Sequence, residues 1–158
     1  MQKAEQVLLR DMTALRQRVS FALLVLLALC GAPSTNVSAQ TSFSIWDGIY
    51  TKAQAERGRR NYTRHCKECH GEDLHGGETA AALVGKELIS FWSETSVGVL
   101  FEEIRDTMPE ENPGALSDRE YADILAFLFQ ANKFPDGEEA LEADVDYLHR
   151  IGISTEPE

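Results

Sequence analysis

The chain has 158 residues, with 15 Lys/Arg against 26 Asp/Glu and a formal net charge of −11 at pH 7. This length indicates one domain, and the acidic balance argues against nucleic acid or an anionic membrane surface as a partner. The sequence shows neither an internal repeat nor an alternating β pattern.

The N-terminus has the pattern of a signal peptide. Residues 1–18 carry four Lys/Arg and lead into an apolar run over residues 19–30. A run of this length suits a signal peptide and is short of the roughly 20 residues that cross a bilayer. Residues 37–39 are Val-Ser-Ala, small residues of the kind that a signal peptidase needs, so the sequence predicts export to the periplasm with cleavage after Ala39.

Two other fates of this segment stay open. One is lipoprotein processing at Cys30, although Leu29 stands where a small residue is preferred; the other is an uncleaved segment that anchors the protein to a membrane. Cleavage after Ala39 would leave 11 basic and 24 acidic residues, a net charge of −13. It would also leave Cys66 and Cys69 as the only thiols.

The first helix of the domain is predicted from about Lys52 to Cys66. It follows a short arm, residues 40–50, and it opens with Thr-Lys-Ala-Gln at residues 51–54, which has the form of a capping box. Gly58 recurs with Tyr62 and Cys66 at every fourth position, so the three lie on one face. A glycine inside a helix costs about 1 kcal/mol relative to alanine, and its expected use here is to let another helix approach closely.

Residues 66–70, Cys-Lys-Glu-Cys-His, form the motif for covalent attachment of c-type haem. Cys66 and Cys69 can each add to one vinyl group of the porphyrin, and His70 can then bind the iron as an axial ligand. A zinc site is one alternative, but it would need two more Cys or His ligands, and only three histidines lie outside the motif. A dithiol redox centre would need a βαβ pattern, which is missing. The sequence therefore predicts one haem c.

Two segments after the motif are expected to enclose this cofactor. Residues 71–85 are rich in Gly and Ala and lack periodicity, which predicts a loop around a flat group. A short helix is predicted over residues 86–92, and apolar residues at helical spacing predict a longer one over residues 96–106. Two prolines forbid a helix through residues 108–114.

The strongest predicted helix runs from Asp118 to about Ala131. A second capping box, residues 117–120, opens it, and its broad apolar side is the expected partner of the Gly58 face. The chain ends in an acidic extension, residues 136–158, in which four apolar residues could contact the domain: Leu141, Val145, Leu148 and Ile151.

Met108 is the predicted distal ligand of the haem iron. The other two methionines lie within residues 1–39, and Met108 sits in the loop that the prolines define. Methionine is more often a core residue, and His75 and His149 are rival ligands that would give a bis-histidine haem of lower potential.

Together these motifs resemble a class I cytochrome c over roughly residues 51–135. The resemblance implies an all-α fold centred on three helices, in which the first and last helices cross at Gly58. It also implies that the haem lies between the attachment motif and the Met108 loop. One departure is that Ala81 stands where such proteins often have a proline whose carbonyl orients the proximal histidine, which leaves that hydrogen bond open.

A narrower resemblance is to the cytochrome c domains associated with pyrroloquinoline-quinone dehydrogenases. The segments that carry it are Trp46-Asp47-Gly48, Phe91-Trp92, Leu100–Ile104, Tyr121–Phe127 and Phe134-Pro135-x-Gly137, in which the variable position is Asp136. It implies a quinoprotein dehydrogenase as one redox partner and a terminal oxidase or another cytochrome as the other.

Two axial ligands leave the iron no vacant position for a substrate. We therefore expect a one-electron carrier, or an electron-transfer subunit of an oxidoreductase complex, and not an enzyme in its own right. The alternatives are a peroxidase-like enzyme with an open haem and a haem-based sensory module, and ligation by Met108 discriminates against both.

Overall fold

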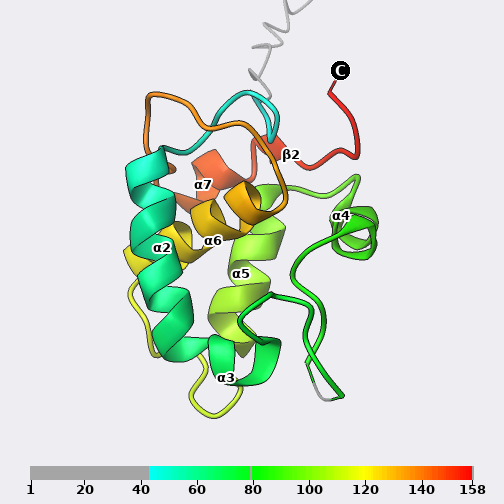
Figure 1. Ribbon diagram of the computed structural model, residues 1–158. Helices are drawn as coiled ribbons and strands as arrows, with labels where there is room; N and C mark the ends of the chain where they lie inside the picture. The colour runs from blue at the N-terminus through cyan, green and yellow to red at the C-terminus, as the bar shows by residue number, and fades with distance from the viewer. Residues whose placement is uncertain (1–42, 79, 158) are drawn as a thin grey trace, which may run out of the picture. The chain divides into compact units, whose positions relative to one another are not determined.

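Helices make up most of the regular structure in a computed structural model that describes residues 43–78 and 80–157 (Figure 1). The elements are β1 (Phe43–Ser44), α2 (Lys52–His65), α3 (Lys67–His70), α4 (Lys86–Trp92), α5 (Val97–Thr107), α6 (Asp118–Ala131), α7 (Val145–Leu148) and β2 (Ile151–Gly152). This confirms the expected all-α class. The predicted signal segment, its cleavage after Ala39 and the alternatives at Cys30 lie outside the described residues. Over the part that is described, no helix is long and apolar enough to span a bilayer.

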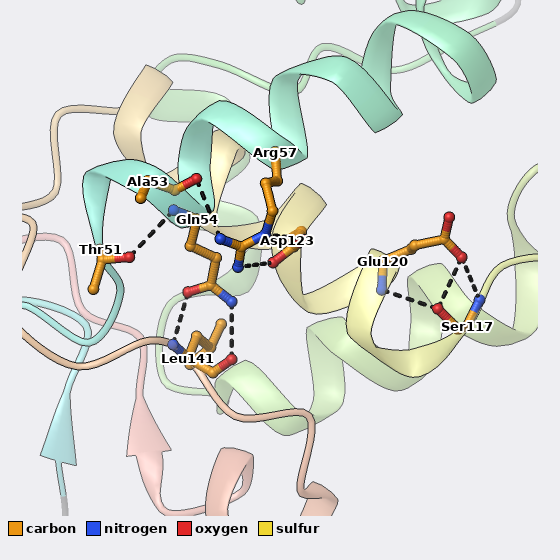
Figure 2. A network of polar contacts seen from close by, with 8 residues as sticks. All are labelled: Thr51, Ala53, Gln54, Arg57, Ser117, Glu120, Asp123 and Leu141. Atoms are coloured by element: carbon orange, nitrogen blue, oxygen red, sulfur yellow. Dashed lines mark hydrogen bonds and ion pairs between the residues drawn. The ribbon is translucent and has the colours of Figure 1, made fainter.

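The N-terminal cap of α2 differs from its prediction. The Thr51 hydroxyl accepts a hydrogen bond from the Gln54 amide at 3.2 Å, as expected. The Gln54 side chain, however, does not return to the cap. It is almost fully buried and instead pairs with the backbone of Leu141, donating at 2.9 Å and accepting at 2.7 Å (Figure 2). The predicted capping box at residues 51–54 is therefore wrong in its second half.

The capping box of α6 is complete, and the helix has the predicted bounds. The Glu120 amide donates to the Ser117 hydroxyl at 3.4 Å, and the Ser117 amide donates to the Glu120 carboxylate at 2.9 Å (Figure 2). These bonds satisfy two amides that the first turn of a helix would otherwise leave unpaired.

Helices α2 and α6 cross at Gly58, as the sequence predicts (Figure 1). A Cβ atom at Gly58 would lie 1.7 Å from the Asp123 carbonyl oxygen and 3.0 Å from Cβ of Phe127. Beside the crossing, the Arg57 guanidinium makes two 2.9 Å hydrogen bonds to the buried Asp123 carboxylate (Figure 2). The crossing therefore combines backbone contact with a two-pronged ion pair.

The arm and the C-terminal extension pair with each other. Strands β1 and β2 are parallel, with Phe43 opposite Ile151. Two-residue strands are too short for a period-2 pattern to be recognised, which explains why the sequence shows no sign of them. Four apolar side chains of the extension are buried in the core: Leu141, Leu148, Ile151 and Ile153.

Candidate haem site

A cavity of about 580 Å³ brings together the four residues predicted to hold the haem: Cys66, Cys69, His70 and Met108. Its volume lies in the range of protein sites for small molecules and cofactors. Its walls are mainly apolar side chains of α4, α5 and α6, which include Leu88, Trp92, Leu100, Ile104, Ile124 and Leu128.

The attachment motif takes its shape from the end of α2 and the single turn of α3. Cys66 ends α2 and donates its amide to the Tyr62 carbonyl at 2.9 Å. The Cys66 carbonyl then accepts from the amides of Cys69 at 3.3 Å and His70 at 3.0 Å. This turn places both thiols and the imidazole on one cavity. Burial, with a smaller effect of the neighbouring Cys69, raises the pKa of the Cys66 thiol to about 11, so the free thiol is protonated at neutral pH.

The His70 imidazole is oriented by a backbone carbonyl. Nδ1 of His70 lies 2.9 Å from the Ala81 carbonyl oxygen. A carbonyl can only accept, so Nδ1 carries the proton and Nε2 keeps the lone pair that binds a metal. The resemblance left this bond open because Ala81 replaces a proline, and the structure shows that the alanine backbone makes it.

The loop that carries Ala81 is held in place at two points. The Gly76 amide donates to the His70 carbonyl at 3.0 Å, and Gly76 has a φ of +71° with Ala80 so near that an added Cβ would clash with its carbonyl oxygen. At the other end, the Asn132 side chain donates to the Leu83 carbonyl at 2.9 Å and accepts from the Gly85 amide at 3.0 Å. The end of α6 therefore fixes the loop.

Met108 lies directly after α5, in a non-helical loop as predicted. Its amide donates to the Ile104 carbonyl at 2.9 Å, and its carbonyl accepts from the Tyr121 hydroxyl at 2.7 Å. Helix α6 thus anchors the backbone from which the half-buried thioether reaches the cavity wall.

The rival histidines lie elsewhere. His75 is exposed beside Asp73, and His149 contacts Ser96 and Glu102; neither lines the cavity. His65, which is also one of the three histidines outside the motif, does line the cavity. The described residues hold no cluster of three or more His, Cys, Asp or Glu suited to a metal ion.

Three wall residues were missed by sequence reasoning. Ile45 of the arm and Ile153 of the extension line the cavity, and Asn132 contributes both to the wall and to the loop contacts. Asn132 directly follows the predicted helix that ends at about Ala131, and its place in the sequence indicates neither role. For the two isoleucines the sequence carries no local signal, since their place depends on pairing between distant segments.

The donor set fits a covalently bound haem. Two thiols, an imidazole with its Nδ1 proton engaged and a thioether all line one largely apolar cavity. With the crossing of α2 and α6, this arrangement is the one expected of a c-type cytochrome domain.

Comparison with known proteins agrees with this class. Residues 53–128 match the family model described as cytochrome c oxidase, cbb3-type, subunit III. This match covers slightly less than half of the chain, and it supports a class I c-type cytochrome domain, which binds haem c and transfers electrons. No curated protein and no solved structure matched the chain significantly.

Proposed function

We propose that the protein is an exported carrier of single electrons with one haem c, attached through Cys66 and Cys69 and ligated by His70 and Met108. The observation that carries this proposal is that the Met108 side chain lines the same cavity as the attachment motif, on a backbone that Tyr121 holds. When bound, haem c supplies an iron that takes up and releases one electron. His70 and Met108 together would leave no site for a substrate on the metal.

The test is the variant Met108→Ala, compared with His65→Ala as a control at the cavity histidine that lies outside the attachment motif. Loss of the thioether should lower the reduction potential, because methionine favours ferrous iron, and should let the reduced protein bind carbon monoxide. The ferric absorption spectrum should lose the sulfur-to-iron charge-transfer band. His65→Ala should change none of these properties.

Covalent attachment supplies the internal check. Haem should stay with the polypeptide on a denaturing gel in wild type and in both variants, so that any spectral change reports ligation. A wild-type protein that lacks the sulfur band and binds carbon monoxide readily would reject Met108 as ligand. It would favour the open-site enzyme or sensor instead.

We further propose a periplasmic quinoprotein dehydrogenase as the electron donor, with a terminal oxidase or another cytochrome as the acceptor. The narrower resemblance supports this proposal. Two of the segments that carry it, Trp46-Asp47-Gly48 and Phe134 to Gly137, lie outside the matched residues 53–128, so this support is separate from the family match. Purified wild-type protein should be reduced by such a dehydrogenase when its substrate is added. Reduction no faster than without the dehydrogenase would reject this partner.

A further inference from the structure

We propose that Ile153 and Ile45 keep water away from the haem and thereby raise its reduction potential, so that the C-terminal extension is a working part of the haem site. This rests on the proposed function, since it takes the haem to occupy the cavity. Both residues lie outside the segment that matches the family model.

The two side chains are buried and face the cavity. Ile45 is 1% exposed and Ile153 is 3% exposed, and both line the cavity next to the apolar surfaces of α5 and α6. Ile151 lies two residues earlier on the same segment and is fully buried, yet it is not part of the cavity wall. The extension therefore offers a cavity residue and a matched core residue of the same type.

Backbone hydrogen bonds on both sides hold Ile153 in this place. The Ile153 amide donates to the Thr95 carbonyl at 2.9 Å, and the Ile153 carbonyl accepts from the Glu94 amide at 3.0 Å. On the other side, the Ile45 amide donates to the Gly152 carbonyl at 2.9 Å. The extension is thus inserted between the arm and the turn that precedes α5.

Side-chain contacts also hold the part of the extension that precedes Ile151. The Gln54 side chain of α2 makes two hydrogen bonds with the Leu141 backbone (Figure 2). The His149 ring lies against Gly98 of α5, where an added Cβ would be 2.6 Å from Cγ of the ring. Its Nε2 lies 3.0 Å from the Glu102 carboxylate. These contacts fix the extension to α2 and α5, so this acidic segment has a structural role.

An apolar wall should raise the reduction potential for an electrostatic reason. The ferric form carries one more positive charge than the ferrous form, and a charge is less stable in apolar surroundings than beside water or polar groups. Burial and dielectric are among the properties by which a protein sets haem potential. Replacing a wall isoleucine by a hydroxyl-bearing residue should therefore favour the oxidised state.

The experiment compares Ile153→Thr with Ile151→Thr by spectroelectrochemical titration of the haem-loaded protein. We expect a lower potential for Ile153→Thr, and also for Ile45→Thr, whereas Ile151→Thr should keep the wild-type potential. Urea unfolding should show that all three substitutions destabilise the fold. Ile153→Val, which keeps the wall apolar, should retain the wild-type potential. It also provides a measurement at this position if the threonine variant fails to fold.

The outcomes separate this inference from the proposed function. Equal shifts for Ile151→Thr and Ile153→Thr would mean that general loosening is the cause and would overturn the inference. An unchanged potential in Ile153→Thr and Ile45→Thr, with the sulfur band intact, would overturn it while the proposed function stands. Wild-type protein without covalent haem would reject the proposed function itself.

Discussion

At Gly58 one hydrogen atom decides how closely two helices approach. The neighbour that an added Cβ would meet at 1.7 Å is a backbone carbonyl oxygen, which cannot rotate away as a side chain can. The glycine is therefore required by the crossing, and its cost to the helix is offset by the contact it permits.

Gly58→Ala should lower the free energy of unfolding by about 1 to 3 kcal/mol, the usual range for overpacking. Gly77→Ala is the matched control, because nothing lies within 4 Å of a Cβ at Gly77, and it should stay within about 0.5 kcal/mol of wild type. Urea denaturation of the haem-loaded protein measures both. Equal stability of the two variants would show that the helices do not touch at Gly58.

At the scale of elements, buried tyrosine hydroxyls join segments that are distant in sequence. The Tyr50 hydroxyl donates to the Phe134 carbonyl at 2.7 Å and ties the arm to the segment that follows α6. Burial, with a smaller effect of Asp136, raises the pKa of Tyr50 from 10.0 to about 12. The folded protein thus favours the neutral hydroxyl that makes this bond.

This shift predicts a loss of stability in alkali. Below pH 10 the contribution of neutral Tyr50 is fully present. As the pH rises from about 10 to 12, the unfolded chain gives up its proton first and the free energy of unfolding falls. Tyr50→Phe should show a flatter dependence in this window by urea titration at several pH values. The same slope in variant and wild type would contradict the assignment of the shift to Tyr50.

The elements themselves were predictable where their signals are local. Helix α6 has the expected bounds because Ser117 and Glu120 form the capping box and a wide apolar face follows. The course of the extension was not predictable, since it depends on contacts such as that of Gln54 with Leu141, which are 87 residues apart. Gln54 was assigned to a local cap because a sequence pattern reports on neighbouring residues and not on a partner 87 residues away.

For the whole molecule the main asymmetry is one of charge. Residues 52–67 hold six Lys/Arg and one Glu, whereas residues 110–146 hold eleven Asp/Glu and two Lys/Arg. The carboxylates that line the cavity add a local bias: they are Glu68, Glu103, Glu110 and Glu111, with no Lys or Arg among the described lining residues. A cationic redox partner should therefore be attracted to the side of the protein on which the cavity lies.

A small probe can test this attraction without the natural partner. Electron transfer to a hexaammineruthenium(III) cation should slow as salt rises, because the Debye length falls from about 10 Å at 0.1 M to about 3 Å at 1 M. The double variant Glu110→Lys/Glu111→Lys should be slower at low salt. Glu138→Lys, which adds a positive charge at an exposed residue away from the cavity wall, should have a smaller effect. Stopped-flow rates independent of ionic strength would contradict the prediction.

The hydrogen bond between His70 and residue 81 has a consequence for how the protein can vary. Because the acceptor is the main-chain oxygen of Ala81, its chemistry is the same whichever side chain the residue carries. The position is then free to change by mutation as long as the loop keeps its path. The orientation of His70 thus depends on the course of the chain, which Gly76 and Asn132 fix, and in the proposed site a substitution at either should alter a bound haem without changing any of its proposed ligands.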